Sequence, residues 1–182
     1  MVDGRAGKKI NMEKINKEIV EKVSKIKLLL TDCDGVLTDG GIYYSKSGEE
    51  MKRFSVRDGM GVERLKQLVQ VETGIITGEN SEIVRQRVNK LEIKEYHPGS
   101  LDKFFTFKEI LRTRNISADQ VAYIGDDTND LEIIRHAGIS ACPADALPMV
   151  KRITHFIMEN KGGHGAFREF AEIIISLKQK AL

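Results

Sequence analysis

The sequence contains no tryptophan, only two cysteines and only three prolines among its 182 residues. Cys33 and Cys142 are too few for a disulfide scaffold or a four-cysteine metal site, and sparse cysteine is typical of a reducing compartment. Residues 1–27 are polar and lack the apolar core of a signal peptide. We therefore expect a cytoplasmic protein.

A surplus of charge of one sign is also missing. The 29 lysines and arginines nearly balance the 27 aspartates and glutamates, which leaves a net charge of +2. Proteins that bind nucleic acids normally carry basic charge that neutralises phosphates. No stretch reaches the roughly 18 apolar residues that a membrane-spanning helix needs. We therefore expect neither a nucleic-acid partner nor a membrane partner.

The pattern of apolar residues predicts one α/β domain over residues 1–182. Continuous apolar runs of strand length alternate with segments of helical spacing, which is typical of a doubly wound (Rossmann-like) parallel sheet with helices on both faces. We expect residues 1–9 to be a disordered tail, 41–56 to insert a β-hairpin, and 161–182 to form a glycine-rich tail and a last helix. The other expected strands are 26–31, 73–77, 121–124, 139–141 and 155–158, and the other expected helices are centred on 15–26, 59–70, 83–91, 104–111 and 128–137.

Acidic side chains follow two of the predicted strands. Asp32 and Asp34 come after the first, and Asp126, Asp127 and Asp130 come after 121–124. Ligands of doubly wound sheets bind beyond the carboxyl ends of the strands. Neighbouring carboxylates repel one another by several kcal/mol at an effective dielectric constant of about 20, so such a cluster needs a cation or shared protons. Oxygen ligands of this kind suit Mg²⁺.

Other interpretations of these aspartates must be weighed. Aspartates in loops commonly make turns or cap helices, and Asp127 and Asp130 have places suited to capping the next helix. An EF-hand is excluded, because Val36 and Leu37 stand where that loop needs a ligand and a glycine. The four histidines, His97, His136, His155 and His164, lack a zinc-site spacing.

Four motifs in order resemble those of the haloacid dehalogenase-like phosphatases. They are Thr31-Asp32-Cys33-Asp34-Gly35-Val36-Leu37-Thr38-Asp39-Gly40, then Thr77 in Ile75-Ile76-Thr77-Gly78, then Lys103 after Pro98-Gly99-Ser100-Leu101-Asp102, and last Gly125-Asp126-Asp127-Thr128-Asn129-Asp130. The chain has no room for a large cap domain between them, which resembles the capless branch of the family.

The resemblance implies a Mg²⁺-dependent phosphatase that works through an aspartyl-phosphate. Asp32 would be the nucleophile, and its covalent intermediate would divide one difficult displacement into two easier ones. Asp34 would be the general acid and then the general base. Thr77 and Lys103 would bind the transferring phosphoryl group. Asp32, Asp126 and the backbone carbonyl of Asp34 would hold the metal. Asp127 and Asp130 would orient Lys103 and metal-bound water. Cys33 is expected to be a small buried side chain.

Three further segments are similar to the branch that acts on 3-deoxy-D-manno-octulosonate 8-phosphate in lipopolysaccharide precursor synthesis. They are Val36–Gly40, Phe54–Gly59 and Gly162–Ala166. The resemblance implies substrate contacts by Ser55, Arg57, Asp58, Gly59, Gly78, Arg87 and Lys103. Arg57 could pair with a sugar carboxylate through two hydrogen bonds. Glu79 stands where that branch often has arginine, which leaves a nine-carbon (nonulosonate) 9-phosphate open as the substrate.

The same branch implies a homotetramer in which a neighbour's hairpin and the glycine tail cover the open site. His164 in that tail is a candidate for substrate contact. Three other functions stay open: a non-catalytic regulator of a nucleotide-sugar synthetase, a phosphotransferase, and a nucleic-acid 3′-phosphatase. The regulator would not need Asp32, Asp34, Lys103 and Asp126 together. The nucleic-acid enzyme should carry a basic stripe with stacking aromatic residues, whereas aromatics are 6% here.

Overall fold

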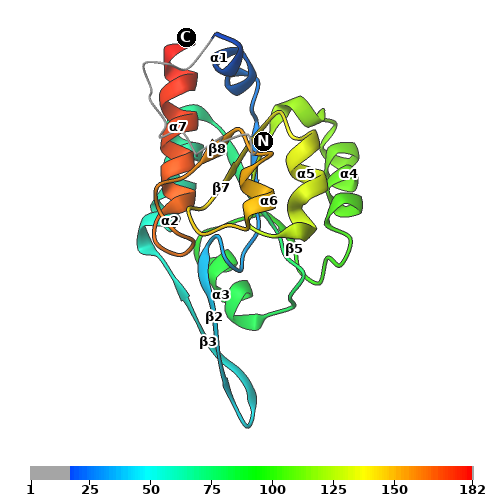
Figure 1. Ribbon diagram of the computed structural model, residues 1–182, viewed down its shortest axis with the longest axis vertical. Coiled ribbons are helices and arrows are strands. Elements are labelled where there is room, and N and C mark those ends of the chain that lie inside the picture. Colours follow the sequence, from blue (N-terminus) through cyan, green and yellow to red (C-terminus); the bar gives the residue numbers. More distant parts are fainter. Residues whose placement is uncertain (1–16, 182) are drawn as a thin grey trace, which may run out of the picture.

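The computed structural model describes residues 17–181, so the tail predicted for residues 1–9 lies outside the described part. Its centre is a parallel sheet (Figure 1), and the six strands of this sheet have the order β5-β4-β1-β6-β7-β8. The strands are β1 (Leu28–Thr31), β4 (Glu72–Ile76), β5 (Glu95–His97), β6 (Val121–Ile124), β7 (Ile139–Cys142) and β8 (Phe156–Ile157). The predicted doubly wound parallel sheet is confirmed.

The order of the strands reverses between β1 and β6. From β1 the chain builds β4 and β5 on one side, and then crosses over to add β6, β7 and β8 on the other. In such sheets the crevice at the reversal point, beyond the carboxyl ends of the strands, is where ligands bind. Residues that follow Thr31 and Ile124 therefore lie at the centre of the candidate site.

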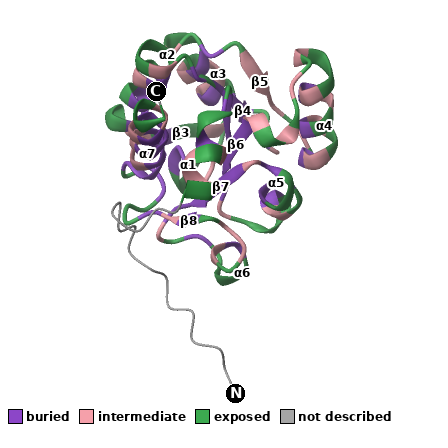
Figure 2. Cartoon of the chain, turned by 90° about the horizontal axis from the view of Figure 1, so that it is seen from above, coloured by how far each residue is buried: buried purple, intermediate pink, exposed green. Residues whose placement is uncertain are grey.

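Helices cover both faces of the sheet, as Figure 2 shows from above. The helices are α1 (Lys17–Ser24), α2 (Val56–Val69), α3 (Glu82–Lys90), α4 (Lys103–Arg114), α5 (Leu131–His136), α6 (Pro148–Lys151) and α7 (Ala166–Lys180). Leu29 of β1 packs in the core that α1, α2, α3 and α7 share, while Leu28 and Leu30 pack in the core beneath α4, α5 and α6. Alternate side chains of a strand point to opposite faces, so a continuous apolar run fits a strand covered on both sides.

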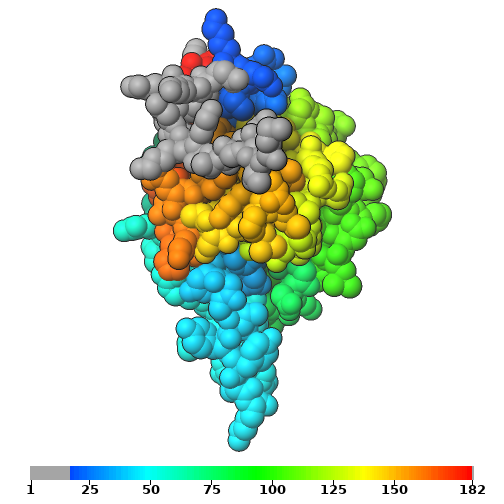
Figure 3. All heavy atoms as spheres, in the orientation of Figure 1, coloured from blue at the N-terminus to red at the C-terminus, as the bar shows by residue number. Residues whose placement is uncertain are grey.

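A two-stranded antiparallel hairpin, β2 (Thr38–Ser45) and β3 (Gly48–Phe54), is inserted after β1. It projects away from the body of the molecule (Figures 1 and 3). The prediction of a hairpin over 41–56 is correct in kind, although β2 begins three residues earlier. The described residues contain no cap domain.

Two short elements escaped prediction. β5 has three residues, all half-buried at the sheet edge, and their charged and aromatic side chains give no apolar run. α6 has four residues and begins with Pro148 at its first position. The helix predicted over 128–137 begins instead with a 3-10 turn, Thr128–Asp130, and a second such turn, Ala118–Gln120, precedes β6. Among the described residues, no helix has the length and hydropathy needed to cross a membrane.

Candidate active site

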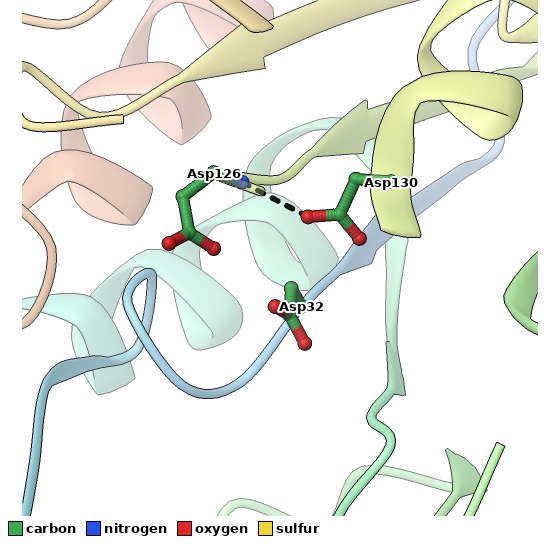
Figure 4. Close-up of side chains that lie close together, drawn as sticks. All are labelled: Asp32, Asp126 and Asp130. Carbon is green, nitrogen blue, oxygen red and sulfur yellow. Dashed lines mark hydrogen bonds between the residues drawn. The ribbon is translucent and has the colours of Figure 1, made fainter. Parts of the chain in front are cut away.

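Adjacent strand ends bring Asp32 and Asp126 together. Thr31 and Ile124 are paired in register, and the backbone N–H of Asp32 donates to the carbonyl of Ile124 at 3.0 Å. One carboxylate oxygen each from Asp32, Asp126 and Asp130 lies within 4.8 Å of the others. Figure 4 shows the three side chains converging from the ends of β1 and β6 and from the following turn.

Asp130 is fully engaged inside this cluster. Its Oδ1 accepts from Lys103 Nζ at 2.8 Å and from the Tyr123 hydroxyl at 2.6 Å. Its Oδ2 accepts from the backbone N–H groups of Asp126, at 2.9 Å, and Asp127, at 3.3 Å. Asp130 therefore fixes both the turn after β6 and the ammonium group of Lys103.

Lys103 begins α4 and is buried beneath the cluster. Its Nζ lies 2.9 Å from Asp32 Oδ1 as well as 2.8 Å from Asp130, and its side chain is 1% exposed. Asp32 Oδ1 also accepts from the backbone N–H of Cys33 at 2.7 Å. A buried ammonium group between two carboxylates offsets part of their repulsion and sets the direction of Asp32.

Burial and the remaining negative charge of the cluster raise the pKa values of two of its carboxyl groups. Burial, followed by the charge of Asp130, raises the pKa of Asp32 to about 7. Burial, followed by the charges of Asp32 and Asp130, raises the pKa of Asp126 to about 8. Asp126 Oδ1 is buried and has no hydrogen-bond partner among the described residues. An unpartnered carboxylate oxygen beside Asp32 is what a hard divalent cation would satisfy, so these residues fit Mg²⁺.

Asp127 is turned differently from its neighbours. Its carboxylate accepts a hydrogen bond from the backbone N–H of Thr128 and caps the 3-10 turn, and the residue is exposed. The structure therefore places Asp130, but not Asp127, in direct contact with Lys103. Tyr123 is a site residue that the sequence did not indicate, because a tyrosine in an apolar strand is expected to be core.

Asp34 is held on both of its oxygens. Thr38 Oγ1 donates to Oδ1 at 3.2 Å, and Lys52 Nζ of β3 donates to Oδ2 at 2.8 Å. Gly35 follows with a φ of +88°, and a Cβ there would overlap the Asp126 carboxylate. Glycine is therefore required at position 35 by both the backbone conformation and the close approach.

Thr77 and Gly78 form the turn after β4. Thr77 is buried. Its backbone N–H donates to the backbone carbonyl of His97 at 3.0 Å, and its own carbonyl accepts from the N–H of Ser100 at 2.9 Å. The turn thus packs against the loop that leads to Lys103. A Cβ on Gly78 would have its nearest neighbour, the Ser100 carbonyl oxygen, 4.0 Å away, so this position is open.

The other predicted substrate residues gather at the start of α2. Ser55 caps that helix, and its carbonyl accepts from Arg87 Nη2 at 3.1 Å. A Cβ on Gly59 would lie 2.6 Å from the same nitrogen of Arg87. Asp58 is buried, and its Oδ1 accepts from the backbone N–H of Arg168 at 2.9 Å, which ties α2 to the first turn of α7.

Arg57 is exposed and lines an open groove of about 570 Å³, whose other walls are α7 and the segment that precedes it. His164 also lines this groove. The His164 ring accepts from Arg53 Nη1 at 3.3 Å and donates through Nδ1 to the carbonyl of Gly162 at 2.7 Å. The structure leaves Arg57 available to a ligand and holds His164 against its own chain.

The glycine-rich segment before α7 packs on the loop that carries Asp34. A Cβ on Gly162 would overlap the carbonyl of Gly35, and the N–H of Gly163 donates to the Val36 carbonyl at 2.9 Å. Gly162 N–H donates to Asp145 Oδ1 at 3.0 Å. The segment therefore supports the loop that carries Asp34 through backbone contacts with Gly35 and Val36.

Comparison with known proteins identifies the family. Residues 1–169 match the model of the haloacid dehalogenase-like hydrolases. The chain belongs to this family. It is 37% identical to the 3-deoxy-D-manno-octulosonate 8-phosphate phosphatase of Yersinia pestis over 163 residues, which are 90% of this chain and 87% of that protein.

Solved structures of such phosphatases share the fold. A structure from Moraxella catarrhalis, in complex with a magnesium ion, a phosphate ion and a KDO molecule, has a TM-score of 0.86 and 35% identity, and the match covers 91% of this chain and 95% of that one. A cobalt-bound structure from Haemophilus influenzae has a TM-score of 0.84 and 38% identity, with 88% and 93% covered.

These findings confirm the predicted family, the predicted fold and the predicted class of enzyme, a phosphoric monoester hydrolase. The predicted cofactor, Mg²⁺, is present in the Moraxella catarrhalis relative, and within the acidic cluster of the present structure the carboxylates of Asp32 and Asp126 are suitable ligands.

Proposed function

We propose that the protein hydrolyses 3-deoxy-D-manno-octulosonate 8-phosphate to the free sugar and phosphate, with Mg²⁺ as cofactor, as a step in making lipopolysaccharide precursors. The observation that carries this is the contact of Lys103 with Asp32, 2.9 Å apart, next to the unpartnered oxygen of Asp126. The 37% identity to a phosphatase of this specificity supports the choice of substrate.

Asp32 is the proposed nucleophile. One of its carboxylate oxygens forms a bond to phosphorus while the bond from phosphorus to the sugar oxygen breaks, and Asp34 gives its proton to that oxygen. Asp34 then takes a proton from a water molecule, whose oxygen attacks phosphorus and releases Asp32 and inorganic phosphate. Lys103, fixed by Asp130, balances charge on the phosphoryl oxygens, and the Thr77 turn binds them.

Asp32, Asp126 and the carbonyl of Asp34 would hold the Mg²⁺. When bound, the ion supplies positive charge that orients the phosphate and offsets its developing negative charge. Asp130 is excluded from this set in our proposal, because both of its oxygens already accept hydrogen bonds.

A nonulosonate 9-phosphate is the second candidate substrate. Glu79, rather than a cation, follows Gly78, and it is exposed beside the Thr77 turn. The other acid-sugar contacts proposed from the resemblance are those of Ser55, Arg57, Asp58, Gly59 and Arg87. A homotetramer, in which a neighbour's hairpin covers the site, belongs to the same proposal.

Phosphate release tests the function. Purified protein is given eight- and nine-carbon acid-sugar phosphates and hexose 6-phosphates, with Mg²⁺ and with a chelator. We expect Mg²⁺-dependent release from one acid-sugar phosphate far above the hexose phosphates, and its loss in Asp32→Asn. Equal turnover of all substrates, or turnover by Asp32→Asn, would contradict the proposal. Transfer of labelled phosphate to an added alcohol instead of water would indicate a phosphotransferase, and binding without turnover a regulator.

A further inference from the structure

We propose that Lys52 is a positioning residue for Asp34, so that the hairpin forms part of the active site of its own subunit. This inference rests on the proposed function, in which Asp34 carries the proton. Lys52 lies in β3, on the projecting hairpin that the family resemblance places over a neighbour's site, and the resemblance gives it no catalytic role. Its side chain is nevertheless 0% exposed and reaches back to the end of β1.

Burying a lysine is unfavourable unless its ammonium group finds anionic partners. Lys52 Nζ has two: Asp34 Oδ2 at 2.8 Å and Glu49 Oε1 at 3.2 Å. The contact with Asp34 spans 18 residues of sequence and joins the hairpin to the loop after β1. The lysine therefore links the position of the hairpin to the position of the Asp34 carboxylate.

The contacts set the direction of Asp34 without blocking it. Thr38 holds Oδ1 and Lys52 holds Oδ2, so the carboxylate cannot turn about its bond without losing both. Each carboxylate oxygen has two lone pairs, and the side chain remains 22% exposed, so an oxygen can still exchange a proton with substrate or water. Proton transfer needs this kind of fixed geometry within hydrogen-bond reach.

Glu49 anchors the other end of the contact. Its Oε2 accepts from Ser81 Oγ at 2.5 Å, and Ser81 is the N-cap of α3, four residues beyond Thr77. Asp34, Lys52, Glu49 and Ser81 thus form one connected polar chain from the acid–base loop, through the hairpin, to the helix after the phosphate-binding turn. The hairpin is held against the body at the place where Asp34 must be steady.

Substrates with different leaving groups test this role. A sugar oxygen needs a proton as it leaves, whereas 4-nitrophenolate leaves without one, so misplacing Asp34 should affect the first far more. For Lys52→Met, we expect the rate of leaving-group release in a single turnover to fall about 10- to 100-fold with the acid-sugar phosphate and less than about 3-fold with 4-nitrophenyl phosphate. Lys52→Arg should recover part of the loss. Lys66→Met, an exposed lysine on α2, is the control and should match the wild type.

Two measurements separate this role from a structural one. Lys52→Met should lower the unfolding midpoint, because Asp34 and Glu49 lose their buried partner, yet it should remain folded at the assay temperature. The Mg²⁺-induced rise in that midpoint should match that of the wild type, because Asp32 and Asp126 keep their places. Equal losses with both substrates, a lost Mg²⁺ response, or no loss at all would overturn the inference. If the wild type hydrolyses no acid-sugar phosphate, the proposed function fails instead, and 4-nitrophenyl phosphate turnover shows whether a phosphatase is still present.

Discussion

At the scale of single residues, the site is a small volume with more negative than positive charge. Lys103 compensates part of the charge of Asp32 and Asp130, while Asp126 keeps an unpartnered buried oxygen. The consequence is that the metal-free protein takes up protons at this cluster on folding. The folded pKa values are about 7 for Asp32 and about 8 for Asp126, whereas an unfolded aspartate titrates near pH 3.9.

The sign of the pH dependence follows directly. Between the unfolded and folded pKa values the folded state binds more protons, so the free energy of unfolding falls as pH rises. We expect urea unfolding in chelator to show decreasing stability from about pH 5 to about pH 8.5. Asp126→Asn should lessen this decrease, and Mg²⁺ should stabilise wild type most at the upper end. The contribution of the cluster is the free energy of unfolding of the wild type minus that of Asp126→Asn. If this difference rises with pH, the pKa values of the cluster are not raised on folding.

Two buried tyrosine hydroxyl groups offer a matched comparison. The Tyr123 hydroxyl donates to Asp130 at 2.6 Å, whereas the buried Tyr96 hydroxyl has no partner among the described residues. We expect Tyr123→Phe to lower the free energy of unfolding by about 1–2 kcal/mol and to lower turnover, because Lys103 loses part of its support. Tyr96→Phe should be neutral or stabilising, since it removes an unsatisfied group. Urea unfolding of both variants checks this, and equal effects would be inconsistent with it.

A functional residue could be predicted from the sequence only where its neighbours along the chain mark its position. Asp32 directly follows one apolar strand and Asp126 comes two residues after another, so the general geometry of parallel sheets predicted their meeting. Lys52 and Tyr123 carry no such signal. In the sequence, Lys52 resembles a solvent-exposed strand residue and Tyr123 resembles a core residue. Only the folded chain shows that each side chain contacts a carboxylate of the site.

At the scale of elements, the glycine-rich segment before α7 is a support for the catalytic loop. A side chain on Gly162 would overlap the Gly35 carbonyl, next to the carbonyl of Asp34 that is proposed as a metal ligand. We expect Gly162→Ala to cost about 1–3 kcal/mol of stability through overpacking and to weaken Mg²⁺ binding measured by calorimetry. Gly78→Ala, at an open position, should leave stability unchanged. Unaltered Mg²⁺ affinity in Gly162→Ala would show that the segment does not support the loop.

Long periodic elements were predictable and short edge elements were not. α2 and α7 carry apolar side chains at helical spacing, and β1 and β6 are continuous apolar runs. β5 is an edge strand of three residues, so its formation depends on pairing with β4 rather than on its own sequence. The same holds for the exact start of the hairpin, where Thr38 pairs with Phe54 although glycines follow it.

At the scale of the whole molecule, the hairpin leaves apolar side chains in solvent. Tyr43, Tyr44 and Met51 are 58%, 69% and 60% exposed, and an isolated two-stranded hairpin is marginally stable. The hairpin projects from the body in Figure 3. An exposed cluster of this kind favours association with another surface, and the resemblance to the capless branch implies that this surface is another subunit.

Replacing the hairpin residues tests the assembly. We expect wild type to sediment as a tetramer, and Tyr43→Ser with Tyr44→Ser to shift the distribution to smaller species, because burial of two aromatic rings stabilises an interface by several kcal/mol, at about 25 cal/mol per Å². Leu101→Ser is the control. Leu101 is 92% exposed and lies outside the hairpin, so its replacement should not change the mass of the assembly. If the double variant keeps the wild-type mass, the hairpin is not the contact. If it dissociates and keeps full turnover, each subunit completes its own site, and the neighbour's hairpin contributes nothing to the chemistry.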